Sequence, residues 1–275
     1  DKACTVRFGG HVQENWADGR CTITCTDYDE VQAVPYDMFI SGSDSKAVNK
    51  LRLWRAHNTT TFNMNLFSQG QYVQALQKNT DAEVISKVLY PSDDHDEGKL
   101  LRLSQQYFLV SATLQNIISD HLTTYGSLYN FADKVAIHIN DTHPALCIPE
   151  LMRILMDVYS YSWDAAWSIV TRVVSYTNHT VLPEALEKWN VDLFRLKLPR
   201  IYMIVEEINR RLCADLWNMY PGDWDRISRM AIVGYSQIRM ANLSVAGSHM
   251  VNGVSRLHSE ILKKSVFHDY YKAMP

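Results

Sequence analysis

The sequence lacks three features that mark large classes of protein: long apolar runs, clustered positive charge and regularly spaced cysteines. No apolar run approaches the roughly 18 to 20 residues that a membrane-spanning helix needs. The formal net charge is −3, and lysine and arginine do not cluster, so the electrostatic signature for binding nucleic acid or an anionic membrane is missing. We therefore expect a soluble protein with a neutral, polar substrate.

The cysteines predict neither a zinc site nor a disulfide framework. No pair has the two-residue spacing of a metal or redox motif. Cys21 and Cys25 would share one face of a strand, where packing accounts for them. Reduced thiols of this kind are typical of the cytoplasm, where we expect the protein to lie. The cysteines are odd in number and irregularly spaced, at Cys4, Cys21, Cys25, Cys147 and Cys213.

Signatures of nucleotide and ester chemistry are also missing. There is no glycine-rich phosphate loop of the Rossmann or P-loop type and no Gly-x-Ser-x-Gly elbow. A self-contained nucleotide-binding enzyme or α/β-hydrolase therefore has little support. The composition that is present, 47% hydrophobic and 21% charged, is that of a globular protein with enough apolar mass for a sizeable core.

The first third of the chain changes character near residue 70. Residues 4–56 have the pattern of strands, with Gly9-Gly10 as a turn, and predict an antiparallel or mixed sheet region. The following residues predict helices over 72–89 and 103–119, separated by a polar loop over 90–98.

One unit occurs three times in the second half: a short apolar run, a polar loop that contains His, and an amphipathic helix. Alternating strands and helices predict a doubly wound, mostly parallel, Rossmann-like sheet. Ligands bind at the carboxyl ends of such strands, so we expect the three loops to converge on one cleft. The runs and their loops are 135–139 into 140–144, 172–176 into 177–180, and 240–246 into 247–253. A long helix with one apolar stripe precedes the third unit, at Ile201, Ile204, Val205, Ile208 and Leu212.

Polar side chains of these loops allow two kinds of site. Asp141, His143, His179 and His249 include metal-ligand types, but no tight ligand spacing links them. The same residue types hydrogen-bond hydroxyl groups, which favours recognition of a polyol. Each also has an ordinary structural explanation, since Asp141 fits a cap and a loop histidine often only satisfies hydrogen bonds.

Four strings of this sequence resemble the glycogen and maltodextrin phosphorylases, the α-glucan phosphorylases. They occur in the family's order and at about its spacing, and weaker matches at 52–54, 221–223 and 259–264 extend the resemblance over essentially the whole chain. The strings are LYPSDDHDEGK at 89–99, NDTHP at 140–144, YTNHTVLPEALE at 176–187 and AGSHMVNGV at 246–254.

The resemblance implies one half of a GT-B type glycosyltransferase, with the active site between two Rossmann-like domains. Residues 1–275 would be the later part of the N-terminal, glucan-binding domain. Such enzymes release glucose 1-phosphate from an α-1,4-glucan and phosphate with retention of configuration. Their pyridoxal phosphate is bound from the C-terminal domain, and its lysine has no match here. We therefore expect a piece of a longer enzyme that is inactive alone.

The resemblance also assigns residues. Asp93 matches the carboxylate of the family's gating loop, where a negative charge would stabilise an oxocarbenium-like transition state. His179 matches the histidine beside the sugar's hydroxymethyl group. The expected substrate-binding set is completed by Asp94, Arg102, Asp141, His143, Thr180 and Glu184. We expect Asp141, His143, His179 and Glu184 to gather at the carboxyl edge of the sheet, with the 92–98 loop overhanging them.

Some positions depart from the family's pattern, and other functions stay open. The loop has Ser92 and Asp94 around Asp93, and the 233–239 segment lacks the acidic and lysine residues of the animal enzymes' glycogen storage site. The 72–89 helix matches one that packs across the family's homodimer interface. The alternatives are a non-catalytic carbohydrate-binding or regulatory module and, third, a metal-dependent hydrolase that uses Asp141 and the histidines.

Overall fold

The computed structural model describes residues 2–17, 20–59 and 64–275. The chain divides into two compact units. Unit 1 comprises Asp1–His11 and Cys25–Ser119, and unit 2 comprises Val12–Thr24 and Asp120–Pro275. Each unit is mixed α/β. No helix within the described ranges has both the length and the apolar character required to cross a membrane.

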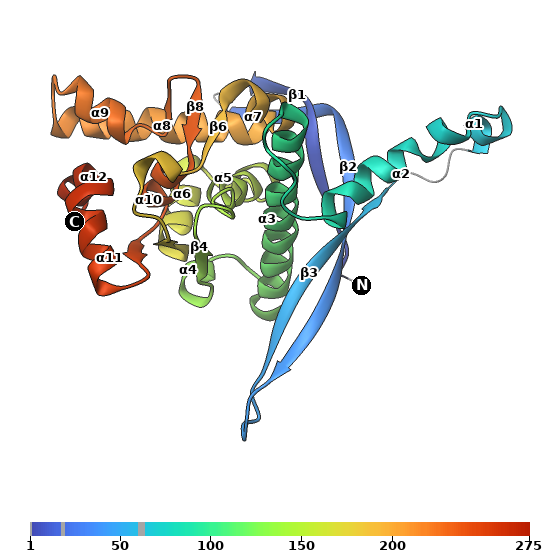
Figure 1. The fold of residues 1–275 in the computed structure, drawn as a ribbon, viewed down its shortest axis with the longest axis horizontal. Helices are drawn as coiled ribbons and strands as arrows, with labels where there is room; N and C mark the ends of the chain where they lie inside the picture. The colour runs from blue at the N-terminus through green and yellow to red at the C-terminus, as the bar shows by residue number, and fades with distance from the viewer. Residues whose placement is uncertain (1, 18–19, 60–63) are drawn as a thin grey trace. The chain divides into compact units, whose positions relative to one another are not determined.

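Unit 1 is built on a three-stranded sheet in the order β1-β2-β3 (Figure 1). β2 and β3 pair antiparallel, from Val31 opposite Asn58 to Ser41 opposite Val48. One face of the sheet is buried, because its apolar residues alternate along each strand. The elements that lie wholly or mostly in unit 1 are β1 (Cys4–Ala17), β2 (Arg20–Ser41), β3 (Val48–Asn58), α1 (Met64–Ser68), α2 (Tyr72–Lys87) and α3 (Asp96–Tyr125). Residues 12–17 of β1, 20–24 of β2 and 120–125 of α3 belong to unit 2. The residues of that buried face are Val6, Phe8, Val31, Ala33, Trp54 and Ala56.

Helix α3 covers the buried face of this sheet. The Phe8 and Tyr107 rings meet edge to face with centroids 5.7 Å apart, and the Trp54 indole N–H donates to Thr113 Oγ1 at 3.1 Å. The predicted turn at Gly9-Gly10 is wrong, since both glycines lie inside β1. Their φ angles are +66° and +88°, and a Cβ on Gly10 would approach the Thr26 carbonyl oxygen to 2.5 Å, so glycine is required for the close strand contact.

The two predicted helices of unit 1 are confirmed with different bounds. α2 ends at Lys87, two residues before the predicted end. α3 begins at Asp96 rather than Leu103 and continues to Tyr125. Asp96 and Glu97 occupy its first turn, where acidic side chains favour a helix start. The predicted 90–98 loop therefore ends at His95.

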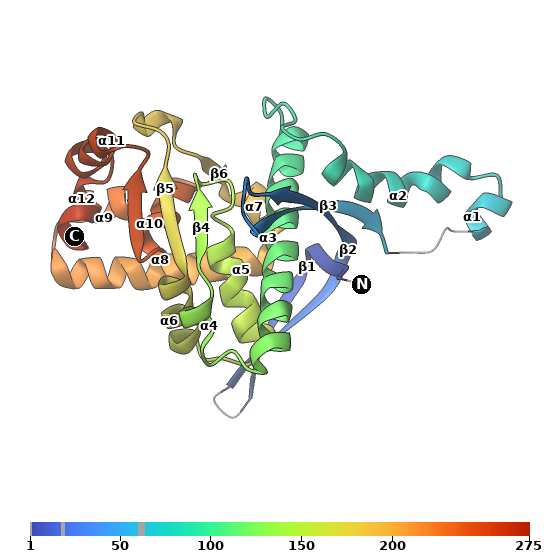
Figure 2. The same ribbon diagram turned by 90° about the horizontal axis from the view of Figure 1, so that it is seen from below.

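Unit 2 contains a parallel sheet in the order β4-β5-β9 and an antiparallel sheet in the order β6-β8-β7. Figure 2 shows β4 and β5 side by side. The strands are β4 (Ile137–Asn140), β5 (Val174–Asn178), β6 (Lys188–Asn190), β7 (Val233–Gly234), β8 (Gln237–Arg239) and β9 (Met250–Gly253). The α-helices are α4 (Phe131–Lys134), α5 (Cys147–Arg153), α6 (Trp163–Val173), α7 (Val191–Lys197), α8 (Pro199–Met219), α9 (Trp224–Met230), α10 (Met240–Ala246), α11 (Arg256–Ile261) and α12 (His268–Ala273). Two π-helices, η1 (Ile154–Val158) and η3 (Leu262–Val266), and a 3₁₀ helix, η2 (Pro183–Ala185), complete the unit.

The parallel sheet and the long helix α8 agree with the sequence pattern. β4 and β5 are the strands of the first two predicted units, and α8 buries Ile201, Ile204, Val205 and Ile208 of the predicted stripe. The second predicted strand-loop-helix pattern differs in detail, since η2 and β6 separate its loop from helix α7. The coarse prediction of a mixed α/β fold with a parallel sheet and an antiparallel region is therefore confirmed, and the doubly wound, Rossmann-like arrangement stays a prediction.

The third predicted strand-loop-helix pattern, at 240–253, is wrong. Residues Met240–Ala246 form helix α10 rather than a strand, and the strand is β9, inside the predicted loop. A short apolar run is compatible with a buried helix or a buried strand, so periodicity alone does not separate them. His249 consequently precedes β9 instead of following a strand.

Candidate functional site

Hydrogen bonds link the carboxyl ends of β4 and β5 and the residues that directly follow these strands. The ladder ends with Asn140 opposite Thr177, and the Asp141 N–H continues it by donating to the Thr177 carbonyl oxygen at 2.9 Å. The His179 Nε2–H donates to Asn140 Oδ1 at 2.5 Å. His179 therefore lies directly across from the start of the Asp141 segment, at one edge of the sheet.

Asp141 turns the chain sharply as it leaves β4. Its φ is +70°, in the left-handed region that Asp and Asn tolerate better than most other residues. Its own Oδ1 accepts the Thr142 N–H at 2.6 Å, which offsets part of the conformational cost. Thr142 is buried, whereas the next residue, His143, is exposed at the surface of this edge.

Two buried residues, Tyr176 and Asn178, hold the loop that follows β5 in place. Asn178 is fully buried; its Nδ2 donates to the Tyr176 hydroxyl at 2.8 Å and its Oδ1 accepts the Thr180 N–H at 3.0 Å. Burial raises the pKa of Tyr176, and the negative charges of Asp141 and Glu187 add to the effect. Tyr176 therefore stays protonated, and Asn178, bonded to its hydroxyl, holds the Thr180 N–H directly after His179.

A chain of hydrogen bonds crosses all three parallel strands. His138 Nε2 lies 2.5 Å from Thr177 Oγ1, which donates to Asn252 Oδ1 at 3.2 Å. Asn252 Nδ2 in turn donates to the Gly253 carbonyl oxygen at 3.0 Å. Thr177 and Asn252 face each other in the β5–β9 ladder. The chain contributes a row of short polar groups along the edge on which His179 lies.

His249 does not belong to this edge. Its backbone N–H donates to the Val174 carbonyl oxygen, at the beginning of β5, so it lies at the amino end of the sheet. The expectation that three histidine loops converge is therefore wrong for the third loop. His258 of α11 comes to the carboxyl edge instead, where its Nε2 meets the Thr180 carbonyl oxygen at 3.1 Å.

The remaining predicted residues of unit 2 lie on the segment after β5, which Figure 2 shows beyond the ends of β4 and β5. Thr180 is half-buried, and its Oγ1 accepts the Leu182 N–H at 3.3 Å. Glu184 is exposed in η2. Sequence reasoning did not single out Asn140, Thr177, Asn252 or His258 as members of this edge.

Asp93, Asp94 and Arg102 lie in unit 1. Arg102 Nη1 is 3.3 Å from Asp93 Oδ2, and the Ser92 hydroxyl donates to Asp94 Oδ2 at 2.8 Å. The loop folds onto the first turn of α3, where the buried Gly98 donates its N–H to His95 Nδ1 at 2.9 Å. This arrangement pairs the predicted gating carboxylate with a cation and leaves Asp94 exposed.

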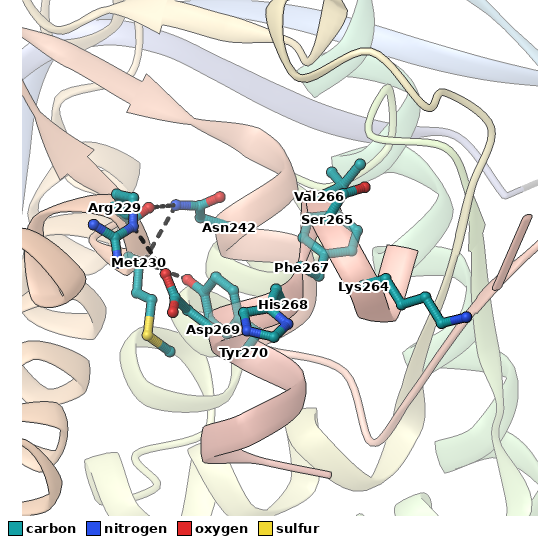
Figure 3. Close-up of a pocket in the computed structure, with 10 residues that line it drawn as sticks. All are labelled: Arg229, Met230, Asn242, Lys264, Ser265, Val266, Phe267, His268, Asp269 and Tyr270. Atoms are coloured by element: carbon teal, nitrogen blue, oxygen red, sulfur yellow. Dashed lines mark hydrogen bonds and ion pairs between the residues drawn. The ribbon is translucent and has the colours of Figure 1, made fainter. Parts of the chain in front are cut away.

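Two hollows in the described parts of the chain lie away from these residues. One, in unit 2, has a volume of about 330 Å³ (Figure 3). Figure 3 shows its polar groups turned toward one another: Asn242 Nδ2 donates to the backbone carbonyls of Arg229 and Met230, Tyr270 donates to the Met230 carbonyl, and Arg229 pairs with Asp269. The other, of about 400 Å³, lies between β3 and α2 in unit 1. Neither contains a predicted site residue.

The described residues hold no group of three or more His, Cys, Asp or Glu side chains placed to bind a metal ion. Cys4, Cys25, Cys147 and Cys213 are not disulfide-bonded, and Cys21 lies outside the described side chains. What the carboxyl edge offers is a dense set of hydroxyl, amide and imidazole groups. Such groups suit hydrogen bonds to a polyhydroxy ligand.

Comparison with known proteins gives consistent matches. A family model described as carbohydrate phosphorylase matches residues 1–275. The glycogen phosphorylase of Bacillus subtilis (strain 168) is 47% identical over 275 residues, which are 100% of this chain and 34% of that protein. The muscle and brain forms of human glycogen phosphorylase are 48% and 47% identical over 281 residues, covering 98% of this chain and 33% of each. The chain spans about a third of the length of these relatives.

Proposed function

Because the chain belongs to the carbohydrate phosphorylase family, we propose that it forms the glucan-binding part of an α-1,4-glucan phosphorylase. Such an enzyme transfers the terminal glucose of glycogen or a maltodextrin to phosphate, and gives glucose 1-phosphate with retained configuration. In this proposal the chain is the later part of the N-terminal domain of a GT-B type glycosyltransferase, and the remaining part of a longer chain supplies the other wall of the active site.

The observation that carries this proposal is the meeting of His179 with Asn140 and of Asp141 with Thr177 at one sheet edge. A pyranose presents hydroxyl groups on several sides, and this edge presents side chains that can donate to and accept from them. Asp141, His143, His179, Thr180 and Glu184 would orient the sugar. The proposal assigns proton transfer to none of these five residues.

Asp93 has a different proposed role. A carboxylate near the reacting carbon stabilises positive charge that develops in the transition state. Arg102, 3.3 Å away, would fix the direction of the Asp93 carboxylate while the site is empty of sugar. Asp94 is bonded to Ser92 and would hold the turn of the loop.

The cofactor of such an enzyme would be pyridoxal phosphate, which forms a Schiff base with a lysine. None of the lysines whose side chains the structure describes is buried; Lys87 and Lys264 line the two hollows but are exposed to solvent. The residues present therefore do not fit this group. We assign its binding to a part of the enzyme outside this chain.

Helix α2 is the proposed contact with a second copy of the enzyme. Ala82 and Ile85 are buried on the side of α2 that packs on β3, whereas Tyr72, Val73 and Val84 are exposed. Exposed apolar side chains on one helix favour an intermolecular contact. Sedimentation of the complete enzyme with Val73→Glu should show a shift from dimer to monomer, and an unchanged dimer would place the interface elsewhere.

Asp93→Asn in the complete enzyme tests the catalytic proposal, with Asp96→Asn as the matched control in the same segment. If removing one electrostatic stabiliser costs on the order of 3 kcal/mol, kcat falls about a hundredfold or more while KM changes little. Asp96 pairs with Lys99 at the surface, so its variant should keep normal kinetics. The assay is glucose 1-phosphate formation from glycogen and phosphate.

Two outcomes would contradict the proposal. A weaker KM with unchanged kcat would place Asp93 in ground-state binding. A complete wild-type enzyme that binds glycogen without forming glucose 1-phosphate would favour the non-catalytic carbohydrate-binding module instead.

A further inference from the structure

We propose that His258, a residue of α11 outside the predicted site, is a positioning residue that holds the Thr180 backbone and thereby places His179. The inference rests on the function proposed above. His258 is 6% exposed and both of its ring nitrogens are engaged. It reaches across 78 residues of sequence to the loop after β5.

The hydrogen bonds of His258 fix its tautomer. The Val254 N–H points at Nδ1 at 3.2 Å, so Nδ1 is the acceptor and carries no proton. Nε2 therefore carries the proton and donates it to the Thr180 carbonyl oxygen at 3.1 Å. A carbonyl oxygen can only accept, so the two contacts agree on one neutral form of the ring.

The ring has no room to turn away. A Cβ on Gly253 would lie 2.8 Å from His258 Cγ, which shows that the imidazole packs directly on the bare backbone of Gly253. Ser255 caps α11 by accepting the His258 N–H at 3.1 Å, and Ser259 Oγ accepts the Gly253 N–H at 3.0 Å. These bonds attach the first turn of α11 to the end of β9 and so fix the backbone from which the His258 ring extends.

At the other end, Thr180 is the residue directly after His179. Its N–H is held by the fully buried Asn178 at 3.0 Å, and its carbonyl oxygen is held by His258. The side chain of His179 is itself exposed. Its direction toward Asn140 therefore depends on how firmly the two peptide groups on either side of Thr180, the next residue, are held. Without the His258 bond, the Thr180 peptide loses its tether on the side away from β5.

Two substitutions separate the two contacts of the ring. In His258→Gln the amide nitrogen can take the place of Nε2 and donate to the Thr180 carbonyl oxygen, while the acceptor for Val254 is lost. In His258→Asn the amide oxygen can take the place of Nδ1 and accept from Val254, but the side chain is too short to reach Thr180. Each variant loses one hydrogen bond and some packing, so a purely structural role would make them similar.

The experiment uses the complete enzyme and measures hydrogen exchange of peptides covering 178–184 together with kcat and KM. We expect His258→Asn to exchange roughly tenfold faster in this segment and to lose about tenfold in kcat/KM. His258→Gln should stay within about threefold of wild type in both. His268→Asn on α12 is the control for replacing an imidazole. The His268 ring bonds through Nδ1 to the backbone carbonyl oxygen of Lys263, five residues earlier in the chain.

Equal exchange in the two His258 variants, or a larger effect in His258→Gln, would overturn the inference. Faster exchange in His258→Asn with unchanged turnover would also overturn it, since the tether would then not serve the reaction. A wild-type enzyme without phosphorolysis would refute the proposed function instead, and the exchange comparison would still decide whether His258 holds the segment.

Discussion

Gly98→Ala tests whether a missing side chain at the start of α3 is what lets the Asp93 loop fold onto the helix. Gly98 is buried and does not have a positive φ, so alanine is compatible with its backbone conformation. The obstacle is steric, because a Cβ would lie 1.7 Å from the Ser92 carbonyl oxygen. Ordinary contact begins near 3.4 Å, so that carbonyl would have to retreat by the difference, about 1.7 Å.

A retreat of this size would break contacts that hold the loop. The Gly98 N–H to His95 Nδ1 bond at 2.9 Å and the Arg102 to Asp93 pair at 3.3 Å would both exceed hydrogen-bonding distance. Such contacts at a partly exposed site contribute about 1 kcal/mol each or less. Alanine in a helix regains up to about 1 kcal/mol over glycine. The free energy of global unfolding should therefore change by about 1 kcal/mol or less.

The loop itself should respond more strongly than the whole unit. If its opening free energy falls by about 1 to 2 kcal/mol, hydrogen exchange of peptides covering 90–102 accelerates roughly 5- to 30-fold. Gly70→Ala is the matched control: Gly70 has φ +80° and no atom within 4 Å of its Cβ position. Alanine there should cost about 1 kcal/mol in urea unfolding without changing the 90–102 peptides. Equal exchange of these peptides in both variants would refute the steric explanation.

Three further outcomes are expected. Hydrogen bonds from Arg210, and then from Arg211, lower the pKa of Glu207 from 4.5 to about 2. This carboxylate therefore contributes stability that is fully present above pH 4.5 and is lost as the pH falls toward 2. Glu207→Gln should flatten the dependence of the urea-unfolding free energy on pH in that window, relative to the control Glu206→Gln. The same pH dependence in both variants would contradict the role of Glu207. Tyr235 and Ser236 have φ of +53° and +57°, so Tyr235→Asn with Ser236→Gly should raise the free energy of unfolding by about 1 to 2 kcal/mol in urea. A decrease would show that the contact of the Tyr235 ring with the Arg239 guanidinium, 5.8 Å from its centroid, outweighs the backbone strain. The chain on its own should form no glucose 1-phosphate from glycogen and phosphate, and turnover near that of a complete enzyme would contradict the assignment of the cofactor to another part of the protein.

The sequence predicted elements where burial produces a regular pattern. The stripe of α8 recurs at helical spacing, and four of its five predicted residues are buried. The β4 and β5 strands end where apolar residues give way to Asn, Asp and His, so the edge that carries Asp141 and His179 could be located without a structure. Parallel strands place both loops on that edge whatever their sequences are.

Elements that depend on tertiary contacts were not predictable in the same way. β9 has an exposed Met250 and polar Asn252, so its strand conformation comes from pairing with β5 rather than from its own pattern. The β6-β8-β7 sheet uses strands of two or three residues, which are too short for a period to appear. His258 lay inside a predicted helix, where nothing local distinguishes a tether from a surface residue. Ser255 at the cap position three residues earlier was the signal that could have fixed the start of α11.

The left-handed backbone of Asp141 limits which substitutions are informative at this position. Asparagine and glycine can adopt φ +70°, whereas a β-branched or longer residue would carry a conformational penalty before any ligand is considered. A tolerance survey at residue 141 would therefore rank amino acids first by backbone preference and only then by chemistry. Asp141→Asn is the replacement whose effect reports on the negative charge, because it leaves both the turn and the acceptor for the Thr142 N–H in place.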